Sequence, residues 1–148
     1  MSDKIKLTID VKKLVKELED MGRDVDRALT PAVMAGGLVI RDAARILIAH
    51  SPATGHVYSY GNVEHQASAP GEPPATDTGN LVAGMAVEKG DRSPTVVQAN
   101  VGAAAEYDEA LEFGTSKMRP RPHWRPAIDQ NQGAISAAVE TQLRKAMP

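Results

Sequence analysis

The chain has 148 residues, a hydrophobic fraction of 42% and a formal net charge of −2, which together predict a single domain with an apolar core. The near-neutral charge argues against a protein that works mainly by binding nucleic acid. The absence of cysteine excludes disulfides and cysteine-based metal or nucleophile chemistry. No apolar run approaches the ~18 residues of a membrane span, and the first residues alternate too early for a signal peptide, so we expect neither.

The N-terminal residues predict a strand followed by a helix. Apolar and polar side chains alternate over residues 5–9, which is typical of a half-buried strand. Asp10 is a candidate N-cap for a helix that presents apolar residues at helical spacing over residues 11–21. Gly22 is expected to end this helix or to bend it.

A second helix is expected to begin at Thr30 and Pro31, because threonine caps helices and proline is favoured in the first turn. Its apolar stripe consists of Val33, Gly37, Ile40, Ala44 and Leu47. Each glycine of the pair Gly36 and Gly37 costs roughly 1 kcal/mol relative to alanine. We therefore expect a close neighbour at this point and a buried helix.

Residues 51–80 interrupt the periodic pattern with repeated glycine and proline. A connection of this length is too long for an ordinary loop in a compact domain, so we expect it to be functional or to become ordered on a partner. Within it, Val57, Tyr58 and Tyr60 predict a short hairpin arm.

The second half of the chain predicts a hairpin and two helices. Alternation over 81–87 and 97–101 indicates two antiparallel strands joined by residues 89–94. A short helix is expected over 107–111, ended by Gly114. A final helix carries Ile128, Ile135, Val139 and Leu143. The fold class is therefore α+β: a small antiparallel sheet packed with two N-terminal helices and a C-terminal helix, plus the long Pro/Gly-rich loop or arm.

Charge changes sign abruptly in the segment that follows the hairpin. The acidic residues are Glu106, Asp108, Glu109 and Glu112, and the basic residues are Lys117, Arg119, Arg121 and Arg125. Two interpretations stay open. The charges form two solvated faces, or the acidic block of one subunit pairs with the basic block of the next, as a head-to-tail assembly requires.

The basic segment also contains the only tryptophan. Arginine and aromatic side chains together can stack on bases, so a nucleic-acid-binding module centred on Arg119–Arg125 is one alternative. Prolines at 120, 122 and 126 stiffen the backbone and remove N–H donors, which favours a rigid arm that docks on a protein. Trp124 is then an interface anchor or a lid on the intramolecular core, and the two roles do not exclude each other.

Asp77-Thr78-Gly79 spells the active-site triplet of aspartic proteases, which suggests a homodimeric enzyme as another alternative. In such enzymes an apolar strand precedes the aspartate, whereas here a Pro-rich stretch does, so Asp77 or Thr78 is more simply a turn cap. The histidines match no compact metal site, and the serines lack a nucleophile elbow. We therefore expect no catalytic residue, no metal and no cofactor.

Three segments together resemble the neck (tail-completion) proteins of long-tailed double-stranded DNA phages. Residues 68–81 (SAPGEPPATDTGNL) are similar to the Pro-rich run that enters a Thr-Gly-x-Leu turn in this family. Residues 105–115 resemble its tyrosine followed by Glu-aromatic-Gly-Thr, and residues 121–127 (RPHWRPA) resemble its Arg-Pro-aromatic-apolar-Arg-Pro-Ala. His123-Trp124 departs from the family, in which a phenylalanine-type residue is expected first.

The resemblance implies a structural virion protein that joins the DNA-filled head to the tail. It implies a ring, six-fold, that contacts head-closure and tail-terminator or tail-tube proteins, with at most weak contact to DNA in the lumen and with no membrane. Such a protein is made and assembled in the host cytoplasm. The interface residues expected are Glu106, Tyr107, Asp108, Glu109, Glu112, Phe113, Gly114, Thr115, Lys117, Arg119, Arg121, Trp124 and Arg125. The arm expected to be ordered on assembly contains Val57, Tyr58, Tyr60, Asp77, Thr78 and Gly79.

Overall fold

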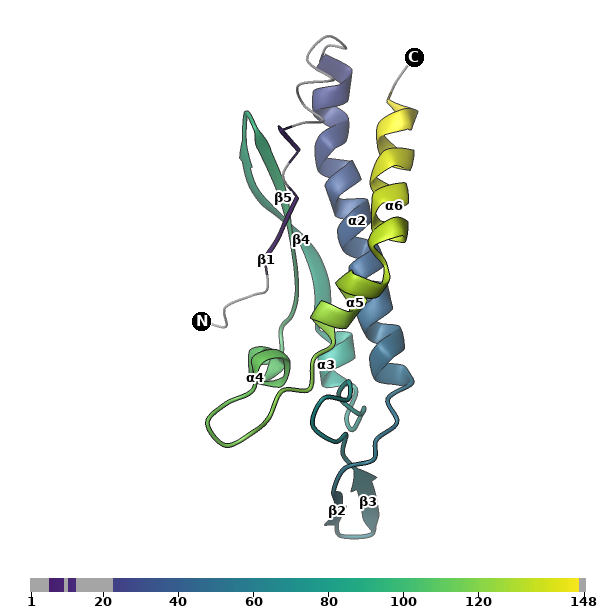
Figure 1. The fold of residues 1–148 in the computed structure, drawn as a ribbon, viewed down its shortest axis with the longest axis vertical. Helices are drawn as coiled ribbons and strands as arrows, with labels where there is room; N and C mark the ends of the chain where they lie inside the picture. The colour runs from purple at the N-terminus through teal and green to yellow at the C-terminus, as the bar shows by residue number, and fades with distance from the viewer. Residues whose placement is uncertain (1–5, 10, 13–22, 147–148) are drawn as a thin grey trace.

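A computed structural model describes residues 6–9, 11–12 and 23–146 of the chain (Figure 1). In this part the fold mixes helices with small antiparallel sheets, which confirms the predicted class at that level. The elements in chain order are β1 (Lys6–Ile9), α2 (Arg23–Ala49), β2 (Val57–Tyr60), β3 (Val63–Gln66), α3 (Asn80–Ala83), β4 (Met85–Ser93), β5 (Val96–Ala103), α4 (Asp108–Phe113), α5 (Trp124–Gln130) and α6 (Gln132–Lys145).

The larger sheet has the order β1-β5-β4, with both pairings antiparallel, and the smaller sheet is the hairpin β2-β3. Alternate residues of β5, such as Val97, Ala99 and Val101, are buried, whereas those between them are partly exposed. This period-2 pattern places one face of the sheet against the helices. Figure 1 shows the resulting two layers, with the sheet on one side and α2 and α6 on the other.

Helix α2 is the centre of the helical layer and contacts α5, α6, β4 and β5. Small residues let the sheet approach it closely: a Cβ added to Gly37 would lie 2.6 Å from Cγ1 of Val87 on β4. This confirms the expected close neighbour of the glycine pair. Two clusters of buried side chains lie along α2, one around Val33 with Val97 and one around Ile40 with Trp124.

The predicted start of this helix at Thr30 was wrong, because α2 begins at Arg23 and contains Pro31. Proline removes one helical hydrogen bond and normally ends or kinks a helix. Here Ala28, Leu29 and Ala32 on both sides of Pro31 are buried in the core. Burial of an apolar face on both sides of the proline accounts for a helix that continues through it.

The strand predicted over 81–87 was also wrong in its first half. Residues 80–83 form the helical turn α3, and the strand begins at Met85. Leu81 and Met85 are both buried, and a spacing of four residues serves a helical turn as well as a strand, so the short apolar pattern was ambiguous. The turn predicted over 89–94 is shorter than expected, because β4 continues to Ser93 and β5 begins at Val96.

The short helix predicted before Gly114 is confirmed as α4. The single C-terminal helix is found as two, α5 and α6, divided at Asn131, whose side-chain Nδ2 donates to the carbonyl of Ala127. Asparagine favours such breaks because its side chain competes for backbone partners. Of the helix predicted over 11–21, only Val11 and Lys12 lie in the described residues, and Val11 is buried whereas Lys12 is exposed. None of the described helices is long and apolar enough to cross a bilayer.

Candidate functional site

The three segments that carry the family resemblance meet at one end of the molecule, around α4 (Figure 1). Backbone bonds join them: the N–H of Arg121 donates to the carbonyl of Leu111 at 2.6 Å, and the N–H of Gly71 donates to the carbonyl of Pro120 at 2.9 Å. The Nε of Arg121 donates to the carbonyl of Ser68 at 2.9 Å. Segments about 50 residues apart in sequence therefore form one continuous structure.

Glu112, near the end of α4, accepts hydrogen bonds from the start of α5, across the loop that joins the two helices. Its Oε2 accepts the backbone N–H groups of His123 and Trp124 at 2.8 and 2.9 Å, and its Oε1 accepts that of Arg125 at 2.9 Å. These are unpaired donors of a helix N-terminus, where a negative charge is also favoured by the helix dipole. Glu112 is buried, so it acts as a remote cap for α5.

Asp108 accepts a hydrogen bond from the side chain of Trp124 and so fixes the position of the indole ring. Both of its carboxylate oxygens lie 3.1 Å from the indole Nε1 of Trp124, and Oδ1 lies 2.8 Å from Nε2 of His123. The backbone N–H of Ala103 donates to Oδ2 at 3.2 Å. Trp124 is 1% exposed and His123 is fully buried. Of the two roles expected for Trp124, this burial confirms the lid on the intramolecular core, and the interface role stays a prediction.

The second ring nitrogen of His123 faces the other carboxylate. Its Nδ1 lies 3.4 Å from Oε2 of Glu112 and makes no hydrogen bond. A buried imidazole thus lies between two carboxylates and bonds to only one of them. Nothing in the sequence marked His123 as part of this cluster, because its only signal was its position beside Trp124.

The expected block of four exposed acidic residues is therefore corrected. Asp108 and Glu112 are buried and paired within the chain, because they hold donors of the loop and of α5. Glu106 and Glu109 are exposed. On the basic side, Arg121 is partly buried and bonded to Ser68, whereas the side chains of Lys117, Arg119 and Arg125 are exposed. Tyr107, Phe113 and Thr115 are exposed as well.

Gly114 gives the loop after α4 its direction. Its φ of 77° lies in the left-handed region, and an added Cβ would lie 2.8 Å from the carbonyl oxygen of Met118. Only glycine fits this combination without strain. The turn that follows is closed by Thr115, whose backbone N–H donates to the carbonyl of Met118 at 2.7 Å.

A second carboxylate cap stabilises the loop next to this structure. Glu72 accepts the hydroxyl and the backbone N–H of Thr54, and also the backbone N–H of Ala69 at 2.8 Å. The hydrogen bond from the Thr54 hydroxyl, followed by those from the two backbone N–H groups, lowers the pKa of Glu72 below its ordinary value of 4.5. No sequence pattern predicts this interaction, because it links residues 18 positions apart.

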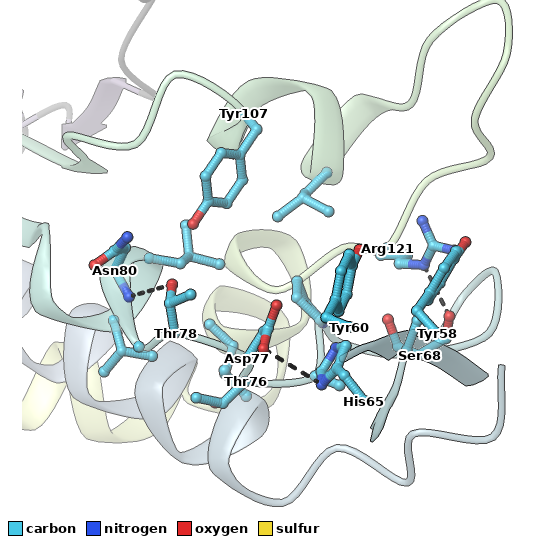
Figure 2. A pocket seen from close by; sticks show the side chains of 18 residues that line it. Tyr58, Tyr60, His65, Ser68, Thr76, Asp77, Thr78, Asn80, Tyr107 and Arg121 are labelled. Atoms are coloured by element: carbon cyan, nitrogen blue, oxygen red, sulfur yellow. Dashed lines mark hydrogen bonds and ion pairs between the residues drawn. The ribbon is translucent and has the colours of Figure 1, made fainter. Parts of the chain in front are cut away.

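The predicted hairpin arm is confirmed as β2 and β3, in which Tyr58 faces His65 across the two strands. Between this arm, α3 and α4 lies a hollow of about 550 Å³ (Figure 2). Tyr107 enters it from α4, Tyr58 and Tyr60 from β2, and Asp77 from the loop before α3. This volume is within the range of ligand and peptide pockets.

Asp77 does not have the surroundings of a protease aspartate. It lies in a bend, no strand precedes it directly, and its side chain is 55% exposed with His65 Nδ1 at 3.8 Å. A shared proton between two aspartates requires burial beside a twin. Thr78 Oγ1 lies 3.4 Å from the backbone N–H of Asn80, so the alternative prediction, a turn before the next element, fits its position.

The histidines of the arm do not gather into a metal site. His56 packs edge-on against Tyr58 with ring centroids 4.7 Å apart, and His65 faces Asp77. In the described part of the chain, no group of three or more candidate ligands could hold an ion.

Six of the eight large hydrophobic side chains that are exposed in the described residues lie at this end of the molecule. They are Val57, Tyr58, Tyr60, Val63, Tyr107 and Phe113. Exposed apolar side chains that gather on one region are typical of an interaction surface. We call the residues of this region, 57–66, 74–82 and 106–119, the arm-end surface.

Comparison with known proteins adds no relative: the chain matches no protein family, no curated protein and no solved structure.

Proposed function

We propose that this chain is a structural protein of the phage neck, a tail-completion component that forms a ring between the DNA-filled head and the tail. The observation that carries the proposal is the meeting of the three family-like segments at one end of the molecule. Residues 68–72, α4 and residues 120–125 are bonded to one another there. Motifs that form one structure support a common role better than motifs scattered over the fold.

The arm-end surface supports an assembly role. It combines exposed aromatic side chains with charges that have no internal partner: no ion pair to Lys117, Arg119, Glu106 or Glu109 is present in the described residues. Aromatic anchors with charged neighbours are typical of protein interfaces. The partners proposed are other copies of this chain, in a ring of six, and neighbouring head-closure, tail-terminator or tail-tube proteins.

The alternative of a nucleic-acid-binding module is less favoured by the geometry. Trp124 is buried and Arg121 is bonded to Ser68, so neither the indole nor that guanidinium is free to stack on bases. The protease alternative is also less favoured, because Asp77 lies in a bend that no strand directly precedes. In the proposed role the chain acts by association and the lumen makes at most weak contact with DNA.

The experiment is to measure the mass of the purified protein by light scattering coupled to gel filtration over a wide concentration range, with electron microscopy of the same fractions. We expect a closed ring whose mass is six times the 15.8 kDa of the chain, reached directly or from a monomer as concentration rises. A dimer at every concentration would contradict the ring and would lead to assays of Asp77→Asn for proteolysis. A filter-binding titration against salt tests the nucleic-acid alternative, which requires steeply salt-dependent affinity.

A further inference from the structure

We propose that the hollow between the hairpin arm, α3 and α4 is the receptor for Phe113 of a second copy of this chain. Lys117 and Arg119 of that copy would then lie beside Asp77 and Glu106. This inference rests on the proposed ring, to which it adds the contact between neighbours. It assigns a partner to the hollow and to the most exposed aromatic side chain on α4.

The hollow has the shape and chemistry to receive an aromatic ring. Pro74, Leu81 and Leu111 contribute apolar wall, and the rings of Tyr58, Tyr60 and Tyr107 also line the hollow (Figure 2). Aromatic side chains pack well against such walls, edge-on or offset. Tyr60 and Tyr107 are 65% and 47% exposed, so apolar surface is uncovered in the isolated chain.

Phe113 has the opposite character, because it is a large apolar side chain with nothing to cover it. It is 60% exposed, although it directly follows the buried Glu112. Leu111 lines the hollow, and Phe113 lies two residues further along α4, about 200° around the helix axis. Phe113 therefore projects away from the hollow of its own chain and cannot enter it.

The charges beside the two features are complementary. Lys117 and Arg119 follow Phe113 in the loop, and both are exposed with no acidic partner in the described part of the chain. At the hollow, Asp77 is 55% exposed, and Glu106 is exposed next to Tyr107. Arg121 also lines the hollow, but its Nε is bonded to Ser68. Charge of this kind fixes the register and orientation of a contact more than its strength.

A protrusion that cannot enter the receptor of its own chain can enter the receptor of another copy, and a one-way contact of this kind is head-to-tail. Such a contact leaves a free protrusion at one end and a free receptor at the other, so it generates a closed ring or an open filament. This is the type of contact that the proposed function requires. A two-fold contact would instead be reciprocal, with Phe113 of each copy in the hollow of the other.

The absence of cysteine allows a direct test by crosslinking. Ser116→Cys and Thr78→Cys are prepared as separate proteins, mixed, and treated with a short bis-maleimide. Ser116 is chosen because it is exposed close to Phe113 and leaves that side chain in place, and Thr78 because it is exposed and lines the hollow. We expect a covalent heterodimer from the mixture and little product from either protein alone. Leu38→Cys, at an exposed position of α2, replaces Ser116→Cys in the control mixture. Equal yields from the two mixtures would overturn the inference.

The second measurement is the association of single variants. Phe113→Ser is expected to weaken association by about tenfold or more, as loss of an interface anchor does, whereas Leu38→Ser is expected to leave it unchanged. Lys117→Glu and Asp77→Lys should each weaken association, and the double variant should recover it. A ring that forms equally well with Phe113→Ser would overturn this contact and leave the proposed function intact. A crosslinked product from a protein that forms only dimers would retain the contact and contradict the ring.

Discussion

Replacement of Glu112 by glutamine tests whether a single buried carboxylate holds the loop between α4 and α5. The amide keeps the length of the side chain but offers one oxygen in place of two. That oxygen can keep the bonds now made by Oε2, to the N–H groups of His123 and Trp124. The amide nitrogen would then face the N–H of Arg125, which now donates to Oε1 at 2.9 Å.

The magnitude follows from these three bonds. Two change from charge-assisted to neutral, a loss of about 1 kcal/mol each, and the third donor is left unsatisfied at a cost of about 1–3 kcal/mol. Loss of the negative charge at the start of α5 adds roughly 0.3–1 kcal/mol. A neutral side chain is easier to bury, which offsets part of the sum. We expect Glu112→Gln to lower the free energy of unfolding by about 2–5 kcal/mol, a large share of the 5–15 kcal/mol typical of a domain.

The assay is urea unfolding at one low protein concentration, followed by the fluorescence of Trp124, the only tryptophan. Glu109→Gln is the matched control, because Glu109 is on the same helix and exposed. Its effect should be within about 0.5 kcal/mol of zero. If the two variants unfold within 0.5 kcal/mol of each other, Glu112 is not the cap described above.

Three further predictions concern other parts of the fold. Gly37→Ala should lower the free energy of unfolding by up to about 2 kcal/mol, because overpacking against β4 costs about 1–3 kcal/mol and the gain in helix propensity is about 1 kcal/mol. Gly133→Ala, in open space on α6, should stabilise the protein. Thermal unfolding of the two variants compares them. The side-chain carboxyl of Glu72, followed by carbon NMR, should titrate with a pKa below 4.5, and Thr54→Val should move that pKa back toward 4.5. The stabilisation from the Glu72 carboxylate should be present at pH values above the pKa of Glu72 in the unfolded chain. It should be lost as the pH falls through the lower pKa of Glu72 in the folded protein. Stabilisation that persists below this lower pKa would contradict the prediction. Trp124 should show blue-shifted emission and weak acrylamide quenching even in dilute protein, whereas free quenching would contradict its burial.

Periodicity predicted the parts of the fold in which burial is regular. The strand over residues 6–9, the hairpin after residue 85, the short helix before Gly114 and the hairpin arm were all recognised. The errors lie where tertiary contacts outweigh local signals. Pro31 marked a helix start by local chemistry, but the buried side chains on both sides of it extend α2 by more than a turn toward the N-terminus.

The sequence drew attention to the segment 106–125 but did not show which of its carboxylates are buried. The charges and aromatic residues of the segment 106–125 were recognised, yet a sequence cannot tell which carboxylate points inward. Asp108 and Glu112 are four residues apart and lie on the same face of α4, whereas Glu106 and Glu109 lie outside that face. The spacing was visible, but the donors that make burial favourable come from residues 103 and 123–125, and only the fold brings them there.

The adjacent positions of Glu112 and Phe113 on α4 also determine how mechanical load would pass through the molecule. A pull on Phe113 reaches Glu112 directly, and three short hydrogen bonds carry it into the first turn of α5. From α5 it enters α2, the long central helix, through the packing of Trp124 and Ala127. Tension at this point would thus reach both layers, because Asp108 on the same helix accepts the backbone N–H of Ala103 on β5.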